Sequence, residues 1–459
     1  MRRPCLFAES DALLREKDCN TGERTMEDTI YAPSSAIGGA IAVVRVSGPE
    51  ARRVAELLDR DPAKTPRRLC HVNITQHGEL IDDGMAVLFP SPGSYTGEDM
   101  AEINCHGGMQ TVQRVLAALG SLGFRPAEPG EFTKRAFLDG KMDLSAAEAV
   151  MDVINADAEQ SLKAALLQLH GSVKREIDSV EALLTDALSG IDAAIDYPDE
   201  AEEDTVRELP LSLSMAVERI EKLVGESRRG RVLRDGLRVA IVGRPNVGKS
   251  SLMNALLGSE RAIVTAAAGT TRDVIDEKLS MRGVPVRLID TAGIREADDE
   301  AERIGVDRAR SAIGSADVVC VVLDASVPQT GEDKALLAET RRFTRLIVWN
   351  KSDLPAVLPD DPDAIRVSAK TGDGLTSLTD AILALAAPER SDGAYITNER
   401  HIRALERALE ALKDALRAEE LDCAATDVKN ALHFLGSITG NDVDARVIDR
   451  IFERFCVGK

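Results

Sequence analysis

The sequence predicts a multidomain protein of mixed α/β and all-α parts, in which a Ras-like P-loop domain is inserted into a helical bundle. Three observations carry this prediction. A glycine-rich loop, GRPNVGKS over Gly243–Ser250, stands between an apolar strand-like run and a helix-like run, the context that a phosphate loop requires. Helical periodicity dominates the chain on both sides of the domain that this loop opens. Short apolar strands with turn-rich loops come before all of it and predict an N-terminal α/β domain.

These changes of pattern set the domain boundaries. We interpret the charged first segment as a disordered tail, or as the result of a start codon assigned too early, with Met26 as the natural first residue. In the N-terminal α/β domain, Ile41–Val46, Met85–Phe89 and Met100–Ile103 are typical of strands and Thr111–Leu122 of a helix. The predicted parts are a tail over 1–25, the N-terminal α/β domain over 26–142, the first part of the helical domain over 143–235, the inserted G domain over 236–386 and the second part of the helical domain over 387–459.

The helical parts are recognised by apolar residues at the spacing of one helix face. Ser145 and Glu148 form a capping-box signature at the start of the first part. The helical pattern resumes after Pro210, and the Arg-rich segment Arg228–Arg234 is typical of a linker, although it is also the best candidate for a nucleic-acid contact. The stripes comprise Leu162, Ala165, Leu166 and Leu169 in the first part, and Ile402, Leu405, Leu409, Leu412 and Leu416 in the second. Helices on both sides of one α/β domain predict a single bundle with that domain inserted.

Motifs that surround a nucleoside triphosphate follow the glycine-rich loop in order. Unpaired N–H groups at the start of the following helix face the phosphates, and Lys249 adds a full positive charge. The Ser250 hydroxyl is placed to bind Mg²⁺, and Thr271 of GTTRD can reach both the metal and the γ-phosphate. In DTAG, Asp290 can hold the water shell of the metal, and the N–H of Gly293 can sense the γ-phosphate. The spacing therefore predicts a Mg²⁺-dependent nucleotide hydrolase.

Two further segments identify the base. Asn350–Asp353, with the sequence NKSD, ends in a carboxylate that can accept hydrogen bonds from both N1–H and the N2 amino group of guanine. Ser368–Lys370 would present backbone donors to the guanine O6. Adenine offers neither pattern, so the sequence predicts that the substrate is GTP.

The water-positioning glutamine of Ras-like GTPases is missing, because Ile294 follows DTAG. Water must then be oriented by another residue or by a partner. The acidic stretch Glu296–Arg303 lies just downstream. On spacing alone, its carboxylates are typical of the solvent-exposed face of a helix.

Composition restricts the possible functions and locations. A formal charge of −20 argues against broad electrostatic adhesion to nucleic acid or to an anionic membrane. The seven cysteines are an odd number without paired spacing, which is typical of reduced thiols in the cytoplasm. No apolar run reaches the roughly 18–20 residues that would span a bilayer. We therefore predict a cytoplasmic protein with no membrane partner.

The motifs together resemble the MnmE (TrmE) family of tRNA-modification GTPases, from about Thr29 to the last residue. They are GRPNVGKS, GTTRD, DTAG and NKSD, the segments Ser94–Asp99, Cys105–Gly108 and Pro129–Phe137, and the terminus Phe455–Lys459. The chain departs from the family pattern in its first 25 residues, in the loop Ser34–Gly39, where relatives often carry an Arg, and in its final CVGK, where CIGK is usual.

The resemblance implies a specific activity. Family members form homodimers and act with a flavoprotein, MnmG, in a heterotetramer that installs an aminomethyl or carboxymethylaminomethyl group at C5 of wobble uridine 34 in certain tRNAs. A tetrahydrofolate derivative donates the one-carbon unit, and FAD is bound by the partner. GTP hydrolysis is tied to K⁺-dependent dimerisation of the G domains.

The resemblance also assigns residues. It implies K⁺ ligands at Asn246, Thr265, Ala267 (through its carbonyl) and Thr270, with Glu302 orienting the attacking water and acting beside Lys249 in catalysis. It implies folate contacts at Arg45, Glu102, Lys141 and Lys459, with Cys456 as a candidate thiol nucleophile. The full set of expected GTP contacts is Asn246, Val247, Gly248, Lys249, Ser250, Ser251, Thr265, Ala266, Ala267, Ala268, Gly269, Thr270, Thr271, Asp290, Thr291, Ala292, Gly293, Asn350, Lys351, Ser352, Asp353, Ser368, Ala369 and Lys370.

The residues alone leave two alternative functions open. One is a ribosome-assembly or translation GTPase whose flanking domains bind RNA; the other is a mechanical dimerising GTPase whose first domain is a scaffold without a ligand. Folate binding distinguishes both from the family activity. A single folate pocket that used Lys459 would require the C-terminus to dock beside the first domain, in the same subunit or across a dimer, with Phe452 and Phe455 as anchors.

Overall fold

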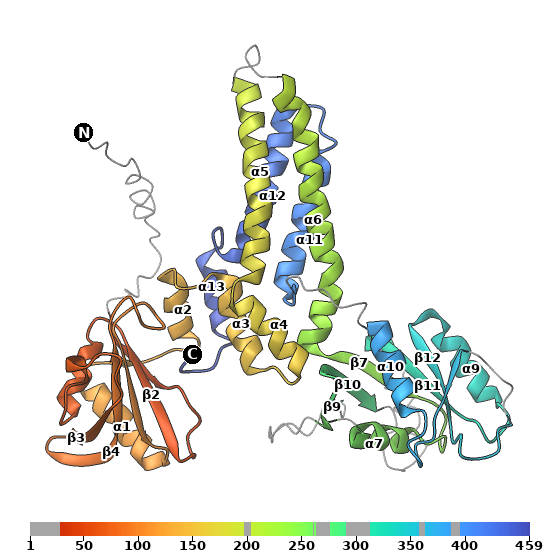
Figure 1. Ribbon diagram of the computed structural model, residues 1–459, viewed down its shortest axis with the longest axis horizontal. Helices are drawn as coiled ribbons and strands as arrows, with labels where there is room; N and C mark the ends of the chain where they lie inside the picture. Colours follow the sequence, from red (N-terminus) through yellow and green to blue (C-terminus); the bar gives the residue numbers. More distant parts are fainter. Residues whose placement is uncertain are drawn as a thin grey trace. The chain divides into compact units, whose positions relative to one another are not determined.

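The computed structural model describes residues 28–196, 203–259, 261–262, 276–290, 313–357, 363–386 and 395–459 (Figure 1). The chain divides into two compact units. Unit 1 combines Met1–Lys141 with Asp449–Lys459, and unit 2 spans Met142–Ile448. The predicted helical part over 387–459 crosses this division, because Asp449–Lys459 pack with unit 1.

Unit 1 is built on a mixed sheet with the strand order β3-β4-β5-β2-β1-β6. Its elements are β1 (Ile30–Pro33), β2 (Ile41–Ser47), η1 (Ala51–Leu57), η2 (Pro62–Lys64), β3 (Cys70–Gln76), β4 (Glu79–Phe89), β5 (Met100–His106), α1 (Met109–Ser121), β6 (Arg125–Pro126) and α2 (Glu131–Leu138). Alternate residues of β2 (Ala42, Val44 and Val46) are fully buried and share one core with Val112 and Val115 of α1. The predicted strands and helix of this domain are confirmed.

The C-terminal tail docks within unit 1, as a shared pocket would require. The Gly130 N–H donates to the Cys456 carbonyl at 3.3 Å. The Phe452 ring lies 6.4 Å from the ring of Phe137 and 5.1 Å from that of Phe455, centroid to centroid. Gly130 has a φ of 68°, and a Cβ there would lie 2.7 Å from the Phe452 carbonyl oxygen, so only glycine allows this approach. The two aromatic residues anchor an end that would otherwise fray.

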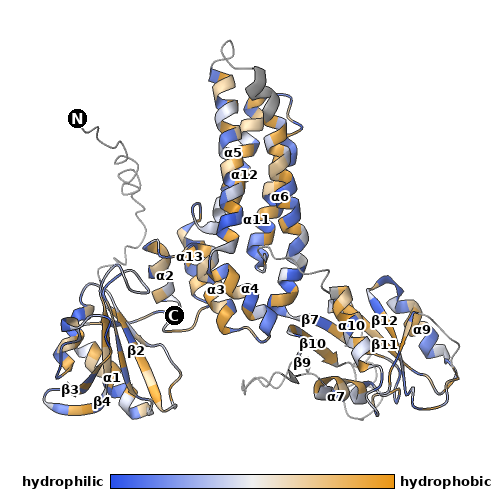
Figure 2. Cartoon of the chain, viewed as in Figure 1, coloured by the Kyte–Doolittle hydropathy of each residue, from blue (hydrophilic) through white to orange (hydrophobic). Residues whose placement is uncertain are grey.

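Unit 2 contains the helical bundle. Its helices are α3 (Leu144–Ile154), α4 (Glu159–Leu169), α5 (Ser172–Asp196), α6 (Glu203–Asp235), α11 (Glu399–Ala415) and α12 (Leu421–Thr439), and α13 (Ala445–Phe452) leads into the tail. Apolar and polar stretches alternate along these ribbons, as in amphipathic helices (Figure 2). One buried cluster joins α5, α6, α11 and α12 and includes Ile177, Leu184, Ile220, Leu405 and Val428. Helices on both sides of the inserted domain therefore share a core, as predicted.

Some local predictions for the bundle are wrong. Helix α6 begins at Glu203 and contains Pro210, and it continues through the Arg-rich segment, which is helical and not a linker. Leu162 and Leu166 are 40% and 38% exposed, while the alanines beside them on α4 are buried. The N-cap of α3 is Asp143, whose carboxylate accepts from two backbone N–H groups, so there is no capping box at this helix start.

Glu148 instead forms a buried polar cluster at the base of the bundle. Its Oε2 lies 2.6 Å from His401 Nε2 and 2.9 Å from Arg400 Nη2. Burial opposes ionisation of Glu148, but the facing charges lower the pKa of its carboxyl group to about 2. Both His401 and Arg400 lower the pKa of Glu148, with His401 the larger cause, while burial lowers the pKa of His401 itself.

The G domain is a twisted sheet with helices, in the order β13-β12-β11-β7-β10-β9-β8 over the strands that the structure describes. Its elements are β7 (Leu237–Val242), α7 (Lys249–Ser259), β8 (Arg261–Ala262), β9 (Asp276–Met281), β10 (Val284–Asp290), β11 (Val318–Asp324), α9 (Gly331–Glu339), η3 (Thr340–Arg342), β12 (Arg345–Asn350), β13 (Ala364–Arg366) and α10 (Leu375–Ala386). The strands β10, β7, β11, β12 and β13 are parallel. Their carboxyl ends therefore meet at one edge, where α/β sheets of this kind bind ligands. No helix among the described residues is long and apolar enough to cross a membrane.

Candidate functional site

The phosphate loop connects β7 to α7 and requires glycine at two positions. A Cβ on Gly243 would lie 2.4 Å from the Val322 carbonyl oxygen of β11. At Gly248, where φ is 95°, a Cβ would lie 2.3 Å from the side-chain nitrogen of Asn350. The Lys249 ammonium donates back to the Gly243 carbonyl at 2.8 Å, so it lies across the loop. This is the arrangement of backbone and charge that cradles phosphate groups.

The base-recognition segments meet this loop through one buried side chain. Asn350, which is 2% exposed, donates from Nδ2 to the Val247 carbonyl at 2.8 Å. Its Oδ1 accepts from the Ala369 N–H at 3.1 Å. The Ser368 hydroxyl donates to Asp353 Oδ1 at 2.7 Å, which fixes the carboxylate that the sequence assigns to guanine. The structure thus brings the phosphate loop, NKSD and Ser368–Lys370 together.

Two carboxylates beside this site, Asp324 and Asp333, were missed by the sequence reasoning. Lys351 of NKSD donates to the Asn246 carbonyl at 2.9 Å and pairs at 2.6 Å with Asp324, the last residue of β11. Burial raises the pKa of Asp324, but the hydrogen bonds from Lys351 and Ser326 together hold that pKa below its usual range. Asp333 of α9 lies 3.3 Å from Arg244 of the loop. The only sequence signal for Asp324 is a carboxylate directly after the apolar run Val318–Leu323.

The structure describes only part of the predicted nucleotide and metal set. Ser250 is the second residue of α7 and is exposed, as a Mg²⁺-binding hydroxyl must be. Asp290 is the last residue of β10. The predicted residues Thr265, Ala266, Ala267, Ala268, Gly269, Thr270, Thr271, Thr291, Ala292, Gly293 and Glu302 lie outside the described residues.

In unit 1, Arg45 and Glu102 face each other on neighbouring strands β2 and β5. Arg45 Nε and Nη2 donate to Glu102 Oε1 at 3.1 and 2.9 Å. The guanidinium carbon lies 5.3 Å from the ring centroid of Tyr95 and 5.7 Å from that of Phe132. The Tyr95 hydroxyl is 2.9 Å from that of Thr133, and burial raises the pKa of Tyr95. Two aromatic rings that sequence reasoning did not select therefore position Arg45.

The other predicted folate residues lie on the docked tail and on a nearby loop. A Cβ on Gly458 would lie 2.1 Å from the Pro33 carbonyl oxygen, at the end of β1, and β1 is the strand that pairs with the Arg45 strand. Lys459 is therefore held at this side of the sheet. Lys141 donates to the Pro92 carbonyl at 2.8 Å, in the loop that leads to Tyr95. Cys456 has an exposed, free thiol.

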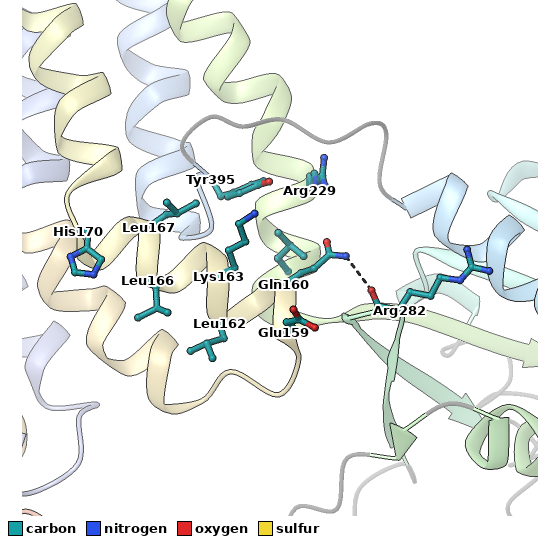
Figure 3. A pocket seen from close by; sticks show the side chains of 11 residues that line it. Glu159, Gln160, Leu162, Lys163, Leu166, Leu167, His170, Arg229, Arg282 and Tyr395 are labelled. Carbon is teal, nitrogen blue, oxygen red and sulfur yellow. Dashed lines mark hydrogen bonds between the residues drawn. The ribbon is translucent and has the colours of Figure 1, made fainter.

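A separate pocket of about 710 Å³ lies in unit 2, between α4, α6 and the turn that joins β9 to β10 (Figure 3). Leucines and the Lys163 stem form much of its wall, with Tyr395 opposite. The Gln160 side chain donates to the Arg282 carbonyl at 3.2 Å, which joins α4 to the turn. This pocket contains none of the predicted GTP or folate residues.

Comparisons with known proteins assign the family. The model for the MnmE helical domain matches residues 144–456, and the model for the GTP-binding protein TrmE N-terminus matches residues 29–141. The tRNA modification GTPase MnmE of Lactiplantibacillus plantarum is 41% identical over 456 residues, covering 94% of this chain and 98% of that protein. The chain belongs to the MnmE family of tRNA modification GTPases. The MnmE of Enterococcus faecalis is 42% identical over 463 residues, covering 95% of this chain and 99% of its own length.

Among solved structures, the G domain of the T. maritima FeoB iron transporter covers 33% of this chain and 99% of its own length, at 28% identity and a TM-score of 0.26. Membership of the MnmE family confirms the resemblance and the combination of an N-terminal domain, a helical domain and a G domain. As a member of this family, the protein is a GTP hydrolase of tRNA modification.

Proposed function

We propose that this MnmE-family chain is a K⁺-activated GTP hydrolase that installs (carboxymethyl)aminomethyl groups at C5 of wobble uridine 34 in certain tRNAs. It would act as a homodimer in the cytoplasm, in a heterotetramer with a flavoprotein (MnmG) that holds FAD, and it would use a tetrahydrofolate derivative. The observation that best supports the GTPase half is the convergence of three nucleotide motifs on the buried side chain of Asn350.

The described residues fit GTP. Lys249 donates to the carbonyls of its own loop at 2.8 and 3.0 Å, and phosphate oxygens would replace those acceptors on binding. Asp353 keeps one oxygen on Ser368, so its orientation toward the guanine edge is set before the base arrives. Mg²⁺, held by Ser250 and Thr271, would neutralise phosphate charge.

The K⁺ part of the proposal rests on Asn246. This residue is exposed in the phosphate loop with a φ of 64°, and its amide oxygen is the kind of hard donor that K⁺ takes. Thr265, Ala267 and Thr270 would complete the ion's oxygen ligands. Glu302 would orient the attacking water in place of the missing glutamine, and the ion would supply positive charge at the phosphates.

The folate half rests on the pair of Arg45 and Glu102. Both Arg45 hydrogen bonds go to Glu102 Oε1, while no partner for Oε2 occurs among the described residues. Oε2 can therefore accept from the amide-and-amine edge of a pterin without breaking the pair. Arg45, Lys141 and Lys459 would face the anionic tail of the folate.

Calorimetry with 5-formyltetrahydrofolate tests the folate half. We expect wild type to bind and Glu102→Gln to bind at least ten-fold more weakly, because a charge-assisted hydrogen bond contributes about 1.5–3 kcal/mol. Glu79→Gln is the matched control, since Glu79 lies on the same sheet and its side chain is 82% exposed. Absence of folate binding by wild type would favour the scaffold alternative. For the K⁺ part, turnover that is equal in K⁺ and Na⁺ at constant ionic strength would contradict the proposed K⁺ activation.

A further inference from the structure

We propose that Asp324 is a positioning residue for the monovalent-cation site, acting through Lys351 on Asn246. This inference rests on the proposed K⁺ activation and adds a residue that lies outside every nucleotide motif. Asp324 touches neither nucleotide nor ion; its effect is on the loop that carries the first cation ligand.

The sheet places the three residues together. β11 lies between β7 and β12, and Asp324 stands at its carboxyl end, paired in register with Asn350. The loop after β7 carries Asn246, and the loop after β12 carries Lys351. The Lys351 ammonium bridges them, 2.6 Å from Asp324 Oδ2 and 2.9 Å from the Asn246 carbonyl oxygen.

The bridge joins two residues that have the left-handed backbone conformation. Asn246 and Lys351 both have a φ of 64°, in the left-handed region, which asparagine tolerates better than most residues and which lysine rarely adopts. Such conformations persist only where the surrounding structure over-determines them. The Lys351 ammonium supplies that constraint, because it is bonded at once to the Asn246 carbonyl and to a fixed carboxylate.

The carboxylate of Asp324 is well suited to act as the fixed end. Its side chain is 9% exposed. Its second oxygen, Oδ1, accepts from the Ser326 N–H at 2.9 Å and from the Ser326 hydroxyl at 2.6 Å. Both oxygens are therefore occupied, and neither the carboxylate nor the ammonium can move without breaking charge-assisted hydrogen bonds.

Removing the charge of Asp324 should therefore act on cation binding more than on base binding. In Asp324→Asn the shape is kept, but Lys351 loses its ion partner, and the Asn246 carbonyl then loses a fixed hydrogen-bond donor. Asn350 and Asp353 keep their own partners, Val247, Ala369 and Ser368. We expect the K⁺ concentration for half-maximal GTP turnover to rise at least ten-fold, while GDP affinity in Na⁺ changes less than three-fold.

The test uses the full chain with two readouts. The first is GTP turnover titrated with KCl at constant ionic strength. The second is independent of turnover: the K⁺-induced rise in thermal-unfolding midpoint with a non-hydrolysable GTP analogue bound, compared with Na⁺. Ser326→Ala is the matched control, because it removes a hydrogen bond from the same carboxylate and leaves the bridge to Lys351 intact. We expect both K⁺ responses to weaken in Asp324→Asn and to persist in Ser326→Ala.

Lys351→Gln breaks the other end of the bridge at a side chain that is one-third exposed, so it keeps the test decisive if Asp324→Asn does not fold. Where Asp324→Asn folds, the double variant of Asp324→Asn and Lys351→Gln should show the same K⁺ shift as either single variant. An unchanged K⁺ response in Asp324→Asn, or an equal loss of GDP affinity in Na⁺, overturns the positioning role while K⁺ activation of wild type stands. A wild type that does not respond to K⁺ overturns the proposed function and this inference together.

Discussion

The C-terminal tail offers the sharpest test of how unit 1 is assembled. Phe455 is 8% exposed, and its ring lies 5.1 Å from that of Phe452, centroid to centroid. Burial of each aromatic residue stabilises the docked tail by about 1.5–3 kcal/mol, and truncation of a buried Phe to Ala typically removes about 3–5 kcal/mol. The Phe455→Ala variant should therefore lose most of the energy that holds the tail, and Lys459 should leave the sheet with it.

The expected readout is folate affinity. If Lys459 contributes one charge-assisted hydrogen bond of about 1.5–3 kcal/mol, Phe455→Ala should weaken 5-formyltetrahydrofolate binding by about 10- to 100-fold. Deletion of Cys456–Lys459 should do the same and abolish tRNA modification, while basal GTP turnover survives. Calorimetry measures the first effect. Phe434→Ala, a similar truncation in α12 of unit 2, should leave folate affinity unchanged.

Lys459→Gln separates charge from docking. This variant keeps both aromatic anchors, so it should lose folate affinity without loss of stability. Full affinity in Lys459→Gln together with loss in Phe455→Ala would refute the ligand role of the tail and leave it only a packing role in the first domain.

Three further predictions concern the G domain and the bundle. Asp353→Asn should weaken GTP binding and improve xanthosine triphosphate binding, since a site built to hydrogen-bond one group discriminates against analogues that lack it by a factor of about 10⁴–10⁵. Unchanged GTP affinity would contradict the assignment of Asp353 to the guanine base. Asn246→Ala should remove the K⁺ response, and Glu302→Ala should lower kcat with nucleotide affinity nearly intact; wild-type kcat without Glu302 excludes it as the water-orienting group. Glu148→Gln should lower the free energy of unfolding at neutral pH by about 3 kcal/mol, because the pKa of Glu148 falls from 4.5 to about 2 on folding. That wild-type advantage is fully present above pH 4.5 and is lost as pH falls through about 2, so a pH-independent difference in denaturant unfolding would disprove it.

The sequence was sufficient wherever a local pattern fixes the outcome. The strand–loop–helix around Gly243 and the period of the bundle helices are of this kind, because a glycine-rich turn and an apolar stripe each have one stable solution. Boundaries that depend on tertiary packing could not be predicted. Pro210 is typical of a helix start, but it lies within the long α6, whose apolar face is held by the bundle core.

The missed residues share one property: each acts through a neighbour that is distant in the sequence. Tyr95 is important because β2 brings Arg45 over its ring, at 5.3 Å from the centroid. Glu148 satisfies the spacing of a capping box. Its carboxylate instead pairs at 2.9 Å with Arg400, which lies more than 250 positions later in the chain. No local pattern distinguishes such carboxylates and aromatic rings from ordinary ones.

The G domain is joined to the bundle by contacts as well as by the chain. The backbone N–H of Gln160 donates to the Gly283 carbonyl at 2.9 Å, and Lys278 pairs with Asp157 at 2.8 Å. Both G-domain residues belong to the β9–β10 hairpin, which connects the GTTRD segment to DTAG. Any rotation of this hairpin against α4 must therefore break a backbone hydrogen bond at the helix start and an ion pair beside it. Since α6 also continues into β7 with only Gly236 between them, the strand that leads to the phosphate loop is tied to the bundle at its base.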